Sequence, residues 1–67
     1  MRKNEFTILV VDDEPGMREG LEKALSLEGF CVETARCGLE AVRRVECGGV
    51  DLSFVDLKPP DIDGCEV

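Results

Sequence analysis

The sequence contains no histidine, tryptophan or tyrosine, and its aromatic residues are three phenylalanines. Without histidine, a candidate site lacks the side chain that proteins use most often as a general base or metal ligand. Four cysteines are present, but no two have C-x2-C spacing, which argues against the common zinc motifs. We expect these cysteines to be small buried apolar side chains that stay reduced.

Positive charge is also scarce. The chain has 8 Lys and Arg residues and 15 Asp and Glu residues, which gives a net charge of -7. Surfaces that bind nucleic acid or anionic membranes need clustered basic residues, so we expect neither partner and favour cations or basic proteins. The apolar run Ile8 to Val11 is far shorter than a signal or membrane segment. We therefore expect a cytoplasmic protein with no membrane segment.

The length of 67 residues corresponds to one small domain. An apolar content of 43% with 34% charged residues is ordinary for a folded globular chain. A chain of this size buries only about 60% of its unfolded surface, so we expect its stability to be low.

Strand-like and helix-like patterns alternate along the chain. The first run, FTILVVD, is rich in β-branched residues and does not alternate with polar ones, which is typical of a strand covered on both faces. Pro15 suits a helix start, Gly29 and Gly48-Gly49 suit helix ends, and Pro59-Pro60 ends the last strand-like run. The sequence predicts strands at about 6–12, 30–35 and 51–56 and helices at about 15–28 and 38–47.

This β-α-β-α-β order predicts an α/β fold with a parallel sheet and right-handed crossovers. Ligands of such sheets gather outside the carboxyl ends of the strands. The first strand ends at Asp12 and Asp13, and the third ends at Asp56. If these strands are neighbours, three carboxylates converge on one edge of the sheet.

Converging carboxylates, with no histidine or paired cysteine nearby, favour a hard divalent cation, and Mg2+ is the simplest choice. A second interpretation is open at this point. Acids are common at helix starts, so Asp12, Asp13 and Glu14 could form a solvated helix N-terminus while Asp56 caps a turn.

The segments ILVVDDEP and FVDLKPPDIDG, with GFCVETARCGLEAV between them, resemble the receiver domain of two-component response regulators. The resemblance runs from about Phe6 to Val67, and its specificity comes from the three segments occurring together in order. It implies a flavodoxin-like parallel sheet, with the chain corresponding to the N-terminal half of a receiver.

By this resemblance, Asp56 is the phosphoacceptor, a carboxylate nucleophile that takes a phosphoryl group from a sensor histidine kinase or a phosphotransfer protein. Asp13 and Asp56 are expected to bind Mg2+ directly, together with the backbone carbonyl of Lys58, while Asp12 acts through a water. We expect the Lys58 side chain to be solvated rather than to bind phosphate.

A complete receiver has five strands and five helices, so the resemblance implies a partial domain, residues 1–67, truncated after the third strand. We expect a phosphorylated signalling module rather than an enzyme with turnover, and self-association through an exposed strand at 51–56. Two alternatives remain. The chain could be a non-switching interaction fragment of a larger regulator, for example a transcriptional one, or a small Mg2+-binding α/β protein.

Overall fold

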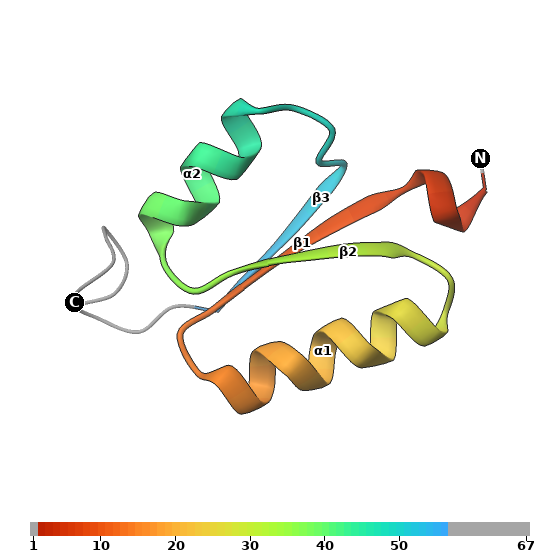
Figure 1. Ribbon diagram of the computed structural model, residues 1–67, viewed down its shortest axis with the longest axis horizontal. Coiled ribbons are helices and arrows are strands. Elements are labelled where there is room, and N and C mark those ends of the chain that lie inside the picture. The colour runs from red at the N-terminus through yellow and green to blue at the C-terminus, as the bar shows by residue number, and fades with distance from the viewer. Residues whose placement is uncertain (1, 57–67) are drawn as a thin grey trace.

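The computed structural model describes residues 2–56, and the predictions for Lys58, Pro59 and Pro60 fall outside that range. Three strands and two helices alternate in it, preceded by one short turn of 3-10 helix (Figure 1). The elements are η1 (Lys3–Glu5), β1 (Thr7–Asp12), α1 (Pro15–Leu27), β2 (Cys31–Ala35), α2 (Gly38–Glu46) and β3 (Leu52–Asp56). The predicted α/β fold is confirmed.

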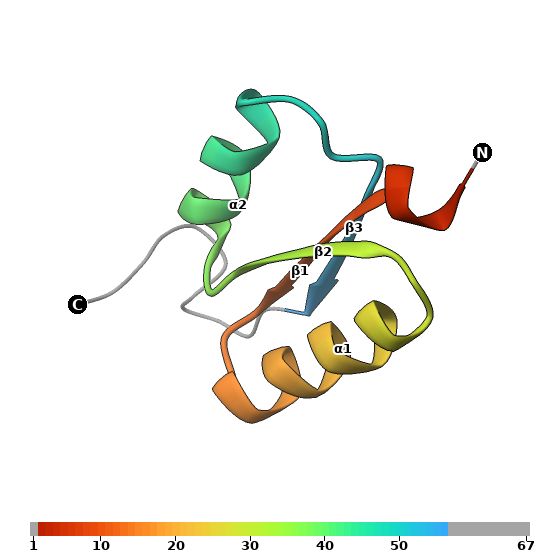
Figure 2. The ribbon, with the colours of Figure 1, turned by 45° about the vertical axis from the view of Figure 1, so that its right-hand side comes forward.

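The three strands form one parallel sheet in the order β2-β1-β3, so β1 lies in the middle. Its register places Ile8 beside Val32 on one side and beside Leu52 on the other. The two helices lie on opposite faces of the sheet, as Figures 1 and 2 show. This arrangement follows from right-handed crossovers that run in opposite directions across the sheet, the first from β1 to β2 and the second from β2 past β1 to β3.

The central strand is the core of the molecule. Leu9, Val10 and Val11 are fully buried, because strands pair with β1 on both edges and a helix covers each face. Leu9 and Val11 pack with Ala35, and Ala41 of α2 extends this cluster. The prediction that the first strand is covered on both faces is therefore confirmed.

Local chemistry explains where α1 begins and ends. Pro15 occupies the first turn, where a missing N–H costs no helical hydrogen bond. At the other end, Gly29 adopts a positive φ of 102°. Its N–H donates to the Ser26 carbonyl at 3.0 Å, and the Phe30 N–H donates to the Leu25 carbonyl at 3.3 Å. This pair of bonds is a Schellman motif, which satisfies carbonyls that the helix leaves open.

The turn η1 has no counterpart in the sequence-based expectations. It lies beside the end of α1, where Lys3 Nζ is 3.6 Å from a carboxylate oxygen of Glu28. The rings of Phe6 and Phe30 meet edge to face with centroids 5.9 Å apart, and Lys3 Nζ lies 5.6 Å from the Phe30 centroid. These contacts connect the first residues to the start of β2.

The cysteines differ from the expectation. Cys31 and Cys47 are free but exposed, whereas Cys37 is buried and disulfide-bonded. The prediction is therefore wrong about burial for Cys31 and Cys47, whose thiols are free as expected, and wrong about the reduced state for Cys37, which is buried as expected. Spacing along the chain could not show this, because tertiary folding decides which cysteines are buried and which meet.

Neither of the helices between residues 2 and 56 is long and apolar enough to cross a membrane.

Candidate functional site

The carboxyl ends of β1 and β3 lie side by side. Asp12, the last residue of β1, is the register partner of Asp56, the last residue of β3. Neighbouring strands are about 4.8 Å apart, and paired residues in parallel strands project their side chains to the same face. The structure therefore brings these two acids together at the edge where parallel sheets bind ligands.

Asp12 is the more constrained of the two acids. Its side chain is only 2% exposed. The carboxylate Oδ1 accepts a hydrogen bond of 2.9 Å from the Glu14 N–H, and the backbone carbonyl accepts one of 2.9 Å from Arg18 Nη1. These bonds hold the end of β1 against the start of α1.

The second carboxylate oxygen of Asp12 indicates what this residue could bind. Oδ2 is buried, and no residue of the described range donates a hydrogen bond to it. Burying a carboxylate oxygen without a donor or a cation costs free energy, typically about 1–3 kcal/mol and more for a charged group. A divalent cation would remove that cost, so the residue fits a metal site.

The burial of Asp12 also bears on the interpretation of the acidic run as a solvated helix N-terminus. A solvated helix N-terminus requires exposed acids, and Asp12 is buried. Glu14 is the N-cap residue of α1, yet its side chain makes no capping hydrogen bond. Instead, Asp12 Oδ1 accepts the Glu14 N–H, as in an Asx turn. The solvated interpretation therefore fails for Asp12.

The other predicted metal ligands do not form a complete site among the described residues. Asp13 is half-buried directly after β1, and Asp56 is exposed at the end of β3. Within residues 2–56, no three His, Cys, Asp or Glu side chains lie close enough together to hold a metal ion. The remaining predicted ligand, the carbonyl of Lys58, lies outside that range. The structure thus pairs Asp12 with Asp56 and does not show a complete ligand set.

Two ion pairs on β2 and α2 were not anticipated from the sequence. Arg44 donates through Nε and Nη2 to the two carboxylate oxygens of Glu33, and its Nη1 donates to the Gly48 carbonyl at 2.8 Å. The hydrogen bonds from Arg44 lower the pKa of Glu33, and those to Glu33 raise the pKa of Arg44. The pair joins residues 11 positions apart, so no helical spacing could reveal it.

The second pair lies at the start of α2. The Arg36 N–H donates to Glu40 at 3.2 Å, and the Arg36 Nε donates to the same carboxylate at 2.7 Å. The backbone hydrogen bond is the main cause that lowers the pKa of Glu40, and the Arg36 side chain adds to it. The four-residue spacing at a helix start is a signal that could have found this pair. The Glu33–Arg44 pair fastens α2 to the sheet, and the Arg36–Glu40 pair joins the loop after β2 to the first turn of α2.

Comparison with known proteins agrees with this geometry. A family model described as the response regulator receiver domain matches residues 8–67. The transcriptional regulatory protein TrcR of Mycobacterium tuberculosis is 40% identical over 60 residues, which are 90% of this chain and 23% of that protein. The response regulator MprA of Mycobacterium ulcerans is 42% identical over 60 residues, which are 90% of this chain and 26% of that protein.

The MprA protein of Mycobacterium avium has the same identity and the same coverage. The chain therefore spans about a quarter of the length of these relatives. No solved structure gives a significant match to the chain.

The matched residues 8–67 include nearly all of β1 and the whole of β3, together with the acids Asp12 and Asp56 that end these strands. The chain belongs to the response regulator receiver domain family.

Proposed function

We propose that this chain is a phosphoacceptor module and that Asp56 receives the phosphoryl group. The observation that carries the proposal is the pairing of Asp56 with the buried Asp12 at the carboxyl edge of the sheet. Asp56 is exposed, so a phosphodonor can reach its carboxylate, while Asp12 is held in place beneath the loop to α1.

The proposed reaction is a phosphoryl transfer. A carboxylate oxygen of Asp56 attacks the phosphorus of a phosphohistidine, so that a P–O bond forms and the P–N bond breaks. The products are an acyl phosphate on Asp56 and a donor imidazole, which takes up a proton from water. The donor is a sensor histidine kinase or a phosphotransfer protein, and the chain turns over no substrate of its own.

Mg2+ is the cofactor that we propose for this step. Asp12, Asp13 and Asp56 would hold it, with the Lys58 carbonyl as a further ligand by family resemblance. When bound, Mg2+ neutralises the charge that develops on the phosphoryl oxygens. The buried Asp12 Oδ2 without a donor among residues 2–56 supports this assignment. Arg18 contributes by donating to the Asp12 carbonyl, which keeps the end of β1 in position.

A phosphorylation assay tests the proposal. The chain is incubated with a phosphorylated histidine kinase and Mg2+, and the label on the chain is followed with and without hydroxylamine, which cleaves acyl phosphates. We expect a hydroxylamine-labile label that disappears in Asp56→Asn and persists in Asp51→Asn. Asp51 is a suitable control because it lies directly before the start of β3, at the end of the sheet opposite Asp56, where its Oδ2 accepts a hydrogen bond from the Thr7 N–H. Equal labelling of Asp56→Asn would refute the assignment.

A second proposal concerns the longer protein in which such a module acts. One relative is named a transcriptional regulatory protein, and we propose that receivers of this type act in the cytoplasm within longer regulators that control transcription. Reading the gene beyond these 67 codons tests this, because a following DNA-binding module would support it and another kind of module would contradict it.

A further inference from the structure

Asp13 lies inside a closed set of three hydrogen bonds where β1 passes into α1. Asp12 Oδ1 accepts from the Glu14 N–H at 2.9 Å, the Glu14 carbonyl accepts from the Arg18 N–H at 3.0 Å, and Arg18 Nη1 donates to the Asp12 carbonyl at 2.9 Å. The backbone of Asp13 is therefore held from both sides. The Arg18 side chain supplies the last of the three bonds, so a substitution at that position opens the set.

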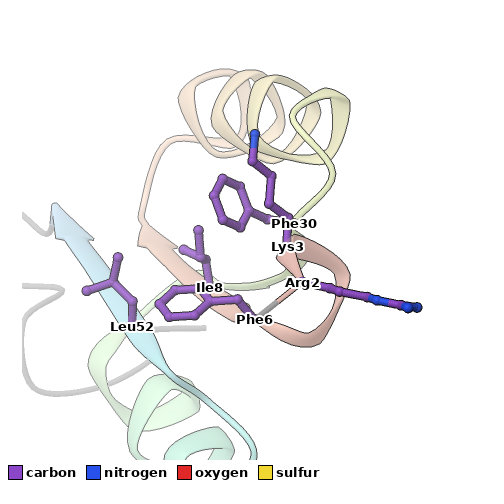
Figure 3. Close-up of a pocket in the computed structure, with 6 residues that line it drawn as sticks. All are labelled: Arg2, Lys3, Phe6, Ile8, Phe30 and Leu52. Atoms are coloured by element: carbon purple, nitrogen blue, oxygen red, sulfur yellow. The ribbon is translucent and has the colours of Figure 1, made fainter.

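The Asp12 carbonyl points toward the β2 side of the sheet. Phe6 lies directly before β1 (Figure 3), and its carbonyl accepts from the Cys31 N–H of β2 at 3.1 Å. Residues two apart in a strand direct their backbone groups to the same side, so Asp12 also faces β2. The pairing with β2 stops at Ala35, and no residue of β2 donates to the Asp12 carbonyl. Arg18 donates in its place, from a half-buried side chain.

Electrostatics agrees with this position of the Arg18 guanidinium. The pKa of Glu40, in the first turn of α2, is lowered mainly by the hydrogen bond from the Arg36 N–H, and the positive charge of Arg18 adds a smaller lowering. α2 follows β2, whereas Asp56 ends β3 on the other side of β1. The guanidinium thus lies on the opposite side of β1 from the proposed phosphoacceptor, so its route to the acids is the backbone.

The peptide group between Asp12 and Asp13 is the part of the site that this bond controls. A peptide group is planar and trans, so its carbonyl and its N–H point in opposite directions. Holding the Asp12 carbonyl toward β2 directs the Asp13 N–H toward β3, the strand that Asp56 ends. Without the bond, the peptide can rotate about ψ of Asp12 and φ of Asp13, and the Asp13 carboxylate would meet a cation in several orientations.

We propose that Arg18 is a positioning residue for the cation site. By fixing the peptide between Asp12 and Asp13, it orients the Asp13 carboxylate before a cation arrives. This role rests on the proposed function, in which Asp13 is a ligand of Mg2+. Groups that orient metal ligands without touching the metal typically change metal affinity by about 10–100-fold when they are removed. Arg18→Gln should therefore weaken Mg2+ binding by about tenfold or more.

The sign of the effect separates positioning from simple charge. If Arg18 acted only through its positive charge, Arg18→Gln would bind Mg2+ more tightly, because the charge repels a cation. Loss of positioning weakens binding instead. Arg18→Lys keeps the charge but not the planar fork of donors, so its affinity should lie between those of the wild type and Arg18→Gln. Arg43→Gln, exposed in the last turn of α2, makes the same charge change and should not weaken binding.

Titration calorimetry of the 67-residue chain with Mg2+ measures these affinities, and circular dichroism in EDTA shows whether each variant is folded. If Arg18→Gln unfolds, Arg18→Lys supplies the comparison, because it too should bind more weakly than the wild type. Binding to the folded variant that is as tight as in the wild type, or tighter, would overturn the role of Arg18 alone. A wild-type chain that binds no Mg2+ would overturn the proposed cation site together with it.

Amide exchange in EDTA supplies a readout that does not involve the metal. The Glu14 N–H belongs to the same set of bonds, through Asp12 Oδ1. Once the peptide is no longer held, this bond should open more often, so the Glu14 amide should exchange faster in Arg18→Gln than in the wild type or in Arg43→Gln. The amide of the fully buried Val10 should keep its rate in all three. An unchanged Glu14 rate would overturn the role of Arg18, whatever the phosphorylation assay shows.

Discussion

Replacing Asp12 by asparagine should stabilise the chain when Mg2+ is absent, although the residue is buried. Asparagine has nearly the same shape, and its Oδ1 can still accept the hydrogen bond that the Glu14 N–H donates at 2.9 Å. The substitution removes the negative charge from a side chain that is 2% exposed and whose Oδ2 has no donor among residues 2–56. It also removes the repulsion between Asp12 and its register partner Asp56.

The size of the effect follows from the spacing of the strands. Two unit charges about 4.8 Å apart repel by about 1 kcal/mol in a water-like medium and by about 3 kcal/mol at an effective dielectric constant of about 20. Asp12 is buried and Asp56 is exposed, so the value for this pair lies between these limits. The free energy of unfolding of Asp12→Asn should rise by about 1–3 kcal/mol, which corresponds to at least about 4 °C in Tm for a chain of this size.

Mg2+ should reduce the difference in stability between the two proteins. A ligand that binds only the folded state stabilises it by about 2.7 kcal/mol at 100 times its Kd. The wild-type chain should gain this stabilisation, and Asp12→Asn should gain less because the acidic edge loses one negative charge. Thermal and urea unfolding followed by circular dichroism, each with EDTA and with Mg2+, measure both effects. Glu22→Gln, on the exposed surface of α1, is the control because it changes the net charge equally.

Either of two results would refute this reasoning. If Asp12→Asn is less stable than the wild type by the same amount with EDTA and with Mg2+, then Asp12 is a structural acid whose second oxygen is satisfied without a cation. An equal gain in Glu22→Gln would instead assign the effect to overall charge and not to the acidic edge.

Other substitutions test the packing and the ion pairs. Leu9→Ala should cost about 2.7–5 kcal/mol because Leu9 is fully buried, whereas Leu27→Ala, at 80% exposure, should change urea unfolding by less than about 0.5 kcal/mol. Equal costs would contradict the assigned core. Arg44 lowers the pKa of Glu33, so Glu33 adds stability that is fully present above about pH 4.3 and is lost as the pH falls through its lowered pKa. Acid unfolding of Glu33→Gln should therefore differ from the wild type above that pH and converge with it below, and a constant difference would contradict the pairing.

The type and order of the elements could be predicted from the sequence because they depend on neighbours a few residues apart. The run Phe6 to Val11 is rich in β-branched residues and does not alternate with polar ones, and most of it forms the buried central strand β1. Pro15 and Gly29 lie where α1 starts and where its Schellman motif closes. The acids that end the first and third strand-like runs were visible for the same reason, since each directly follows an apolar run.

Tertiary structure decided what depends on residues far apart in the chain. The strand order makes Asp12 and Asp56 register partners, and packing buries the first while leaving the second exposed. The Glu33–Arg44 pair and the burial of Cys37 have the same origin. Local propensity acts through side-chain entropy and spacing along one element, whereas burial and strand register arise only when separate elements share a core. The sequence alone therefore identified the acids that end the first and third strands, and the fold determined that Asp12 is buried and Asp56 exposed.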